Sequence, residues 1–307
     1  MIRVGLVGAG PWTGMFHAPM LAAAPDIELS GIWARRPEAA QALAREHASL
    51  AVPSFEDLLR GCDAVAFSVP PDVQAHYAPL AARAGKHLLL EKPLAFTAAA
   101  AQAIADAADA AGVTTQLMLT YRFTPQVRDF LAAAGAATVR HARLGWITSA
   151  ALPGSPFATP WRKAPGAALF DVGPHALDLL DAALGPVTEL LAAQSGGVTS
   201  ITSRHADGAV GQVALSLTTP GATGPVEAVA VTDSGILVLA DPTPVRPQEV
   251  QSLIAEDFVR TVRGEIEQSL DVHRGVEIQR LIEAATVSID TGRPVRLDQI
   301  PRPRPAR

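Results

Sequence analysis

The chain has 307 residues, of which 49% are hydrophobic and 18% charged, and its formal net charge is −5. This composition excludes a disordered or low-complexity chain, and the acidic balance argues against a dedicated binder of nucleic acid or anionic membranes. The single cysteine, Cys62, excludes an intramolecular disulfide and a cysteine-based zinc site. At roughly 100–200 residues per domain, the length predicts two domains.

No segment has the roughly 20 predominantly apolar residues that a membrane span requires. The chain starts almost directly with a predicted strand, and no basic region followed by an apolar one precedes it as in a secretory signal. We therefore expect a cytoplasmic protein whose partner is a small-molecule substrate, not a nucleic acid or a membrane.

Short apolar runs alternate with amphipathic segments over residues 1–120. The predicted strands are Ile2–Val7, Ile27–Trp33, Leu50–Val52, Ala64–Val69, His87–Leu90 and Thr114–Leu119. The predicted helices between them are Met15–Ala24, Pro37–His47, Ser54–Arg60, Val73–Ala84 and Thr97–Ala111. This alternation is typical of βαβ units and of a parallel sheet covered on both faces. Residues 1–120 are therefore predicted to be an α/β domain of the Rossmann type.

The pattern changes over residues 121–307, where strands follow one another across turns such as Asp207-Gly208. The predicted strands are Val139–Ile147, Thr188–Ala193, Gly197–Ser203, Gly211–Thr218, Val226–Val231 and Ile236–Leu239. The predicted helices are Gly173–Leu184, Glu249–Arg263 and Val272–Asp290, and the tail Pro301–Pro305 is predicted to be non-helical. We expect an α+β domain with a largely antiparallel open sheet.

The apolar strands of the second domain point to a further partner. Val210–Leu217 and Val226–Val231 are apolar enough to suggest that the open face of this sheet is buried against another subunit. We therefore expect a homodimer or homotetramer.

A glycine-rich segment, Gly8 to Gly14, joins the first predicted strand to the first helix. Such a turn lets the backbone approach a pyrophosphate, and the helix N-terminus supplies unpaired N–H groups. The usual spacing places a third glycine at residue 13, where this chain has Thr13. Either Thr13 substitutes for that glycine or the loop is one residue longer, and a plain tight turn is the alternative to both. The candidate cofactor-binding residues here are Gly8, Gly10, Pro11, Trp12 and Thr13.

The end of the second predicted strand lacks the acid that usually binds the adenosine ribose. Ala34 stands there, followed by Arg35 and Arg36. Because guanidinium groups form charge-assisted bonds with phosphate oxygens, this pair favours NADP over NAD. The alternative is a solvated arginine pair at a helix start.

Three residues have side chains suited to proton transfer or to the stabilisation of negative charge. Lys92, in Glu91-Lys92-Pro93, brings an ammonium group to the carboxyl edge of the predicted sheet, where it can stabilise a developing negative charge. Asp171 and His175 are four residues apart at a helix start, which places both on one face if the helical spacing holds. Histidine is a natural proton shuttle because its pKa lies near neutrality. The alternatives are a lysine in a surface turn, and a helix cap beside a packed histidine.

These motifs together resemble the Gfo/Idh/MocA oxidoreductases. The resemblance covers roughly residues 2–185 and rests on the following segments in order: the glycine loop, His17-Ala18-Pro19, Val69-Pro70-Pro71, Ala84–His87, Glu91-Lys92-Pro93, Tyr121-Arg122-Phe123 and Asp171–His175. It implies that His175 is the general acid/base, assisted by Lys92 and Asp171, and that the Lys92–Pro93 peptide bond is often cis. Thr120 departs from the family pattern, where an asparagine is common, which puts the substrate contacts there in doubt.

The resemblance also implies the remaining site residues and the activity. Ser68, Pro70, Glu91 and Lys92 join the cofactor-binding set, and Tyr121, Arg122, Trp161 and Arg162 are the candidate substrate-binding residues, although Arg122 serves equally well as a structural partner of a carboxylate. We expect a reversible NAD(P)-dependent hydride transfer at a secondary alcohol or ketone of a sugar, polyol or related cyclic substrate. The alternative is a non-catalytic NADP-binding sensor of the same fold. No metal site is predicted, because the histidines are scattered, and His17 is interpreted as a structural helix residue.

Overall fold

A computed structural model describes residues 1–222, 224, 226–239 and 247–301 of the chain. These residues form two compact units, the first made of residues 1–120 and 247–276 and the second of residues 121–239 and 277–301. The chain passes from the first unit to the second after residue 120. Residues 247–276 pack with the first unit, however, whereas the sequence predicts them in the second. The predicted non-helical tail beyond Pro301 lies outside the described residues.

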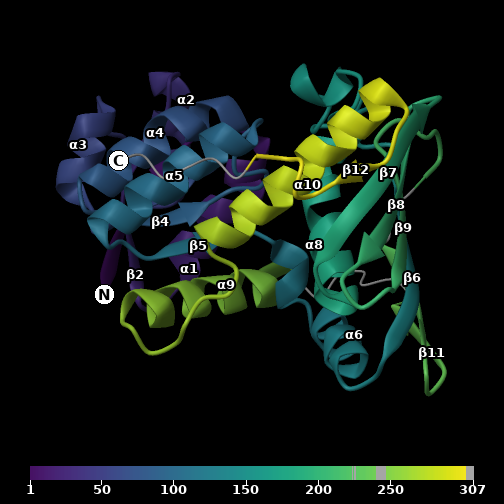
Figure 1. Ribbon diagram of the computed structural model, residues 1–307. Coiled ribbons are helices and arrows are strands. Elements are labelled where there is room, and N and C mark those ends of the chain that lie inside the picture. The colour runs from purple at the N-terminus through teal and green to yellow at the C-terminus, as the bar shows by residue number, and fades with distance from the viewer. Residues whose placement is uncertain (223, 225, 240–246, 302–307) are drawn as a thin grey trace. The chain divides into compact units, whose positions relative to one another are not determined.

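Residues 247–276 belong to the first unit because they complete its core. Helix α9 (Pro247–Val262) packs against α1 (Ala18–Ala23), as Figure 1 shows, and it buries Ile254 and Phe258. The amide of Gln116 donates to the Ile254 carbonyl at 3.1 Å, which ties α9 to a strand of the parallel sheet. These contacts join segments more than a hundred residues apart, so no local pattern reveals them.

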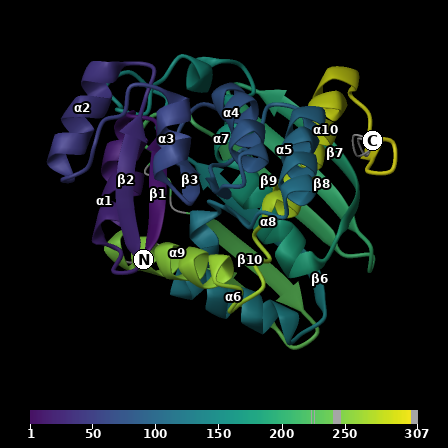
Figure 2. The same ribbon diagram turned by 90° about the vertical axis from the view of Figure 1, so that its left-hand side faces the viewer.

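The sheet of the first unit has five parallel strands in the order β2-β1-β3-β4-β5. The strands are β1 (Ile2–Val7), β2 (Ile27–Trp33), β3 (Ala64–Phe67), β4 (His87–Leu90) and β5 (Thr115–Leu117). Figure 2 shows β2, β1 and β3 side by side. The chain order reverses at β1, and in such sheets ligands bind at the carboxyl ends of the strands beside the reversal. The predicted Rossmann-type fold of this domain is confirmed.

The helices of the first unit agree with the predicted ones to within two residues at most ends. They are α2 (Pro37–Glu46), α3 (Phe55–Gly61), α4 (Pro71–Arg83) and α5 (Ala98–Ala111). The Ser54 and Thr97 hydroxyls accept the N–H groups of Asp57 and Ala100 and so cap α3 and α5. The prediction of a strand at Leu50–Val52 is wrong, since only Ala51 forms an isolated bridge, to Ile32 of β2. The segment is too short to build a ladder.

The sheet of the second unit has seven strands in the order β11-β10-β6-β9-β8-β7-β12. They are β6 (Val139–Ile147), β7 (Val187–Ser195), β8 (Val198–His205), β9 (Val210–Ser216), β10 (Glu227–Thr232), β11 (Ile236–Leu239) and β12 (Val295–Arg296). All neighbours are antiparallel except β6 and β9, which run parallel. The predicted, largely antiparallel sheet is therefore confirmed, and Gly208, with φ +85°, sits in the predicted turn between β8 and β9.

Helix α8 (Gly173–Leu184) packs against β6 and β9 of this sheet, and Figure 1 shows it beside them. The strands alternate between buried and more exposed residues. A row of residues from the exposed set runs across the sheet in register, apolar at its two ends and polar in the middle: Leu191, Thr202, Gln212, Arg143, Val229 and Val238. The face predicted to be apolar is therefore mixed.

The second unit also contains elements that the sequence pattern did not predict. Helix α6 (Pro125–Gly135) begins with a proline in its first turn and buries Val127 and Phe130. The others are the 3-10 turns at Thr120–Phe123 and Trp161–Lys163, the short helix α7 (Ala167–Asp171) and the two-residue β12. The long helix α10 (Val272–Thr291) contributes its first residues to the first unit and the rest to the second. Within the described residues, no helix is both long and apolar enough to span a membrane.

Candidate active site

The glycine loop follows β1 directly and leads into a helical stretch over residues 11–23, which opens into a π-helical turn at Thr13–His17. Gly8 has φ +123°, and a Cβ added there would lie 2.2 Å from the Ser68 carbonyl oxygen, so only glycine fits. At Gly10 an added Cβ would meet no atom closer than 3.9 Å, which leaves that side of the backbone open to a ligand. A glycine backbone in open space before a helix N-terminus fits the pyrophosphate of a dinucleotide.

Thr13 takes the place of the third glycine and ties the loop to the end of β3. Its hydroxyl accepts the Gly10 N–H at 3.1 Å and lies 2.9 Å from the Ser68 hydroxyl. The side chain is fully buried, whereas a Cβ at Gly14 would make only an ordinary contact with Leu43. Of the two loop interpretations, the structure favours the one in which Thr13 substitutes for glycine. Ser68 thus contacts the loop directly, and Pro70 stands just before α4.

Ala34, Arg35 and Arg36 follow β2, at the edge of the sheet where the adenosine ribose of a dinucleotide usually lies. Both arginines are exposed. Among the described residues no carboxylate forms an ion pair with either guanidinium, so both are available to an anion. Trp33, at the end of β2, lies against Phe55 and Tyr77 with ring centroids 5.5 and 5.0 Å away.

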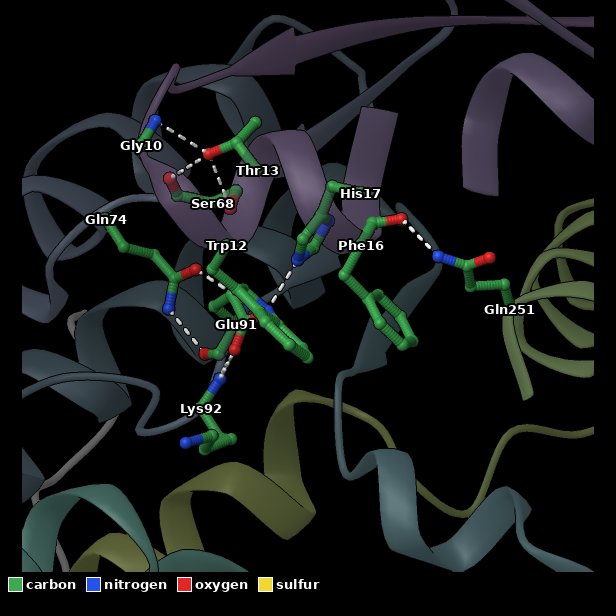
Figure 3. Close-up of polar contacts among 10 residues, drawn as sticks. All are labelled: Gly10, Trp12, Thr13, Phe16, His17, Ser68, Gln74, Glu91, Lys92 and Gln251. Atoms are coloured by element: carbon green, nitrogen blue, oxygen red, sulfur yellow. Dashed lines mark hydrogen bonds and ion pairs between the residues drawn. The ribbon is translucent and has the colours of Figure 1, made fainter. Parts of the chain in front are cut away.

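A buried carboxylate, Glu91, connects the loop to the end of β4, as the close-up in Figure 3 shows. Its Oε1 accepts the indole N–H of Trp12 and contacts Nε2 of His17, each at 2.7 Å. Its Oε2 accepts the backbone N–H of Lys92 at 3.0 Å. Three segments of the first unit therefore meet on one side chain.

The backbone around Lys92 is held from a second direction by Gln74 of α4. The Gln74 side chain, fully buried, accepts the Glu91 N–H and donates to the carbonyls of Glu91 and Leu94, with all three distances between 2.8 and 2.9 Å. The Lys92–Pro93 peptide bond between these anchors is cis. Lys92 is half-buried, and in Figure 3 its side chain leads away from the Glu91 carboxylate.

The surroundings of Glu91 keep it ionised. Burial alone would raise the pKa of this carboxyl, but the hydrogen bond and charge of His17, the charge of Lys92 and the Trp12 N–H together hold the pKa below its usual value. An ionised carboxylate can only accept hydrogen bonds. Nε2 of His17 is therefore the donor in its contact with Glu91.

In the second unit, Asp171 is paired with Arg162. The guanidinium donates to both carboxylate oxygens, from Nε at 2.8 Å and from Nη2 at 3.0 Å. It also lies over the rings of Trp161 and Phe157, at 4.7 and 5.7 Å from their centroids. Asp171 ends α7, and Val172 is the N-cap residue of α8. The carboxylate of Asp171 is thus part of an ion pair.

His175, in the first turn of α8, lies in an aromatic setting. Its ring is 5.4 Å from those of Tyr121 and Trp146, which contact each other at 4.5 Å. Val172 keeps helical dihedral angles, so the four-residue spacing from Asp171 to His175 remains helical. Trp146 is not among the site residues predicted from the sequence, because its only local signal is its position near the end of an amphipathic strand. Among the described residues, no cluster of three or more histidine, cysteine or acidic side chains could hold a metal ion.

Arg122 is occupied by a buried partner. Its Nη1 lies 3.2 and 3.3 Å from the two oxygens of Asp178, whose side chain is 1% exposed. Of the two interpretations that the sequence leaves open for Arg122, the structural pairing with a carboxylate is the one that the geometry supports.

The parallel sheet, the glycine loop at its chain reversal and the open side of the backbone at Gly10 are the features of a dinucleotide-binding Rossmann domain. Residues 2–119 match the model of the Gfo/Idh/MocA oxidoreductase family with its NAD-binding Rossmann fold. The match covers the N-terminal domain of the chain, where the glycine loop and most of the other motifs that carry the resemblance lie.

Two curated proteins are similar to the chain. A dTDP-3,4-didehydro-2,6-dideoxy-alpha-D-glucose 3-reductase of Streptomyces violaceoruber is 31% identical over 60% of this chain and 55% of its own length. The chain thus spans little more than half of that relative. A D-xylose 1-dehydrogenase (NADP(+)) of Haloferax volcanii is 28% identical, over 90% of this chain and 94% of its own length.

A solved structure shares the fold over nearly the whole chain. GenD2 from gentamicin A biosynthesis, solved in complex with NAD, has a TM-score of 0.85 and 23% identity, and the match covers 96% of each chain. At this identity the likeness supports the fold alone.

Proposed function

We propose that the protein is an NAD(P)-dependent oxidoreductase that interconverts a secondary alcohol and a ketone on a sugar, polyol or related cyclic substrate. The observation that carries this proposal is the loop from Gly8 to Thr13, whose geometry fits a pyrophosphate and whose far end is tied through Glu91 to Lys92. The curated relatives described above act on sugars or sugar nucleotides by name, which supports the substrate class.

The roles of the residues follow from their chemistry. A bound nicotinamide would accept or supply the hydride. His175 takes the hydroxyl proton when the alcohol is oxidised and returns it to the oxygen when the ketone is reduced. The Lys92 ammonium is suited to stabilise a developing negative charge, and Asp171, with Arg162, orients the substrate. Tyr121 and Trp161 are partly exposed rings on which an apolar sugar face can pack, whereas Trp146 is buried beside His175.

Within this function we propose that NADP is the preferred cofactor. A carboxylate at the end of β2 would repel a 2′-phosphate, but Ala34 stands there, and Arg35 and Arg36 are exposed and unpaired among the described residues. One curated relative carries NADP in its name and the solved neighbour holds NAD, so both cofactors occur among the proteins similar to this chain. The test compares dissociation constants: NADP should bind more tightly than NAD, and Arg35→Gln together with Arg36→Gln should remove the difference.

We also propose a homodimer or homotetramer in the cytoplasm. The more exposed face of the second sheet carries exposed apolar residues toward its two edges. Leu191 lies toward one edge, and Val231, Ile236 and Val238 lie toward the other. A cytoplasmic location suits an enzyme that draws on a shared nicotinamide pool. Light scattering that gave the mass of one chain would remove the oligomer from the proposal, and cell fractionation tests the location.

The decisive experiment is a substrate screen on a protein whose cofactor binding is already measured. Excess cofactor, at about 100 times its dissociation constant, adds about 2.7 kcal/mol to the stability of the folded protein and raises its melting temperature. Turnover of sugars or cyclic polyols by a protein that passes this test supports the enzyme. Cofactor binding without turnover of any such substrate favours the NADP-binding sensor, and no binding at all rules out both.

A further inference from the structure

The hydrogen bonds of Glu91 join two functional parts that are far apart in the sequence. Trp12 belongs to the glycine loop, His17 to the helix behind it, and Lys92 to the end of β4. The Trp12 and His17 contacts span 79 and 74 residues, and both end on the same oxygen, Oε1. The other oxygen, Oε2, holds the Lys92 N–H. A displacement of the loop or its helix therefore reaches Lys92 through one carboxylate.

His17 has a single task in this arrangement. The ring is 0% exposed, and its Nδ1 has no hydrogen-bond partner among the described residues. A buried polar atom without a partner costs free energy, so the hydrogen bond from Nε2 to Glu91 is what places a histidine here rather than an apolar residue. Because the ring is fully enclosed, His17 can influence a bound ligand only through its neighbours.

Two contacts of Trp12 can be separated by mutation. Its indole N–H reaches Glu91, while its ring stacks on Phe16 with centroids 4.7 Å apart and an angle of 14° between the planes. The Phe16 carbonyl in turn accepts the Gln251 side chain from α9 at 3.0 Å, as Figure 3 shows. The helix that carries His17 is thus anchored from behind, and Glu91 is the link on its other side.

We propose that His17 and Trp12 are positioning residues, which act through Glu91 to hold Lys92 in register with the phosphate loop. This inference rests on the proposed function, because it assigns Lys92 to the reacting oxygen. Beyond that function, His17 and Trp12, which take no part in the reaction, set its rate because they fix the position of Lys92. His17, interpreted from the sequence as a structural helix residue, then contributes to turnover.

The principal test compares His17→Leu with His17→Gln. Leucine removes the donor, whereas the glutamine amide can place an N–H near the position of Nε2. We expect His17→Leu to lower kcat about tenfold to a hundredfold, the factor that corresponds to a lost hydrogen bond to a charged group. The dissociation constant of the cofactor should stay near that of the wild type, and His17→Gln should restore most of kcat. Ser54→Ala, which removes the cap of α3 elsewhere in the same unit, controls for stability alone.

A second readout does not depend on turnover. The chain has four tryptophans, so the indole N–H region of an NMR spectrum should contain four signals, and the Trp12 signal is identified by its loss in Trp12→Phe. If Glu91 couples the segments, this signal should move in His17→Leu and stay in place in His17→Gln. Phe16→Leu, which removes the stacking but not the donor, is the matched control for Trp12→Phe: only Trp12→Phe should lower kcat about tenfold.

The outcomes separate the inference from the function on which it rests. Equal kcat values for His17→Leu and the wild type, or equal losses in His17→Leu and His17→Gln, would overturn the positioning role. An unmoved Trp12 signal in His17→Leu would overturn the coupling, whether or not a substrate is known. A wild-type protein that binds no nicotinamide cofactor would instead contradict the proposed function, with the NMR result still deciding the coupling.

Discussion

Glu91 in the first unit and Asp171 in the second are equally hidden from water, with side chains that are each 9% exposed. Their partners differ. Glu91 is surrounded by the single N–H donors of Trp12, His17 and Lys92, which come from separate segments. Asp171 faces one guanidinium from a residue nine positions away in the sequence. The first arrangement holds a backbone in place and the second pairs opposite charges. Under the proposed function, His175 and not either carboxylate transfers the proton.

The largest effect should therefore follow from the histidine and not from either acid. We expect His175→Ala to lower kcat by about 10²–10⁴, the usual contribution of a general acid/base, with cofactor affinity unchanged. Asp171→Asn keeps the shape and should have a clearly smaller effect. Steady-state rates with a substrate from the screen, beside cofactor dissociation constants, provide the measurement. A loss in Asp171→Asn as large as in His175→Ala would mean that the carboxylate handles the proton after all.

The stability of the folded protein should depend more on Glu91 than on Asp171. Glu91→Ala leaves three donors, one of them on the fully buried His17, without an acceptor, and removal of one member of a buried charged cluster costs about 3–5 kcal/mol. Asp171→Ala should cost less, about 1–3 kcal/mol, because Arg162 is 18% exposed and can turn toward water. Urea unfolding of both variants measures the difference. Equal losses would show that the many-donor arrangement of Glu91 adds nothing to the fold.

The sequence predicted the residues of these sites better than their partners. The glycine loop, Lys92, Asp171 and His175 stand out because each depends on a spacing of a few residues next to a strand or at a helix start. The link from His17 to Glu91 could not be predicted, since it spans 74 residues and depends on how β1 and β4 are placed in the sheet. The pairing of α9 with α1 was missed for the same reason. Arg162 and Asp171 are near neighbours, but their pairing depends on the path of the intervening loop.

Two glycines of the loop provide a finer test of the first unit. Gly8→Ala forces a Cβ to 2.2 Å from the Ser68 carbonyl at a φ of +123°, so this variant should be destabilised and should bind cofactor poorly. Gly10→Ala meets nothing within 3.9 Å and should unfold like the wild type, yet bind cofactor less tightly because the methyl group occupies the open side of the loop. Melting temperatures with and without NADP separate the two effects. Full cofactor affinity in Gly10→Ala would place the pyrophosphate elsewhere.

The smallest expected effect is on the stability of the folded protein at acidic pH. The pKa of Glu91 is lowered in the folded protein despite its burial, whereas its usual value is 4.5. The ionised form is therefore favoured by folding, and this stabilisation is complete above pH 4.5 and decreases as the pH falls toward the lowered pKa. The neutral side chain of Glu91→Gln does not titrate, so this variant should be less stable at neutral pH and lose less stability on acidification.

His87 and His205, whose pKa values burial lowers from 6.5, contribute a separate loss of stability that begins below pH 6.5 in both proteins. Urea midpoints at pH 7, 5 and 3.5 separate the two ranges. If the wild type and Glu91→Gln lost stability in parallel below pH 4.5, Glu91 would not be a charged acceptor, and its contrast with Asp171 would disappear.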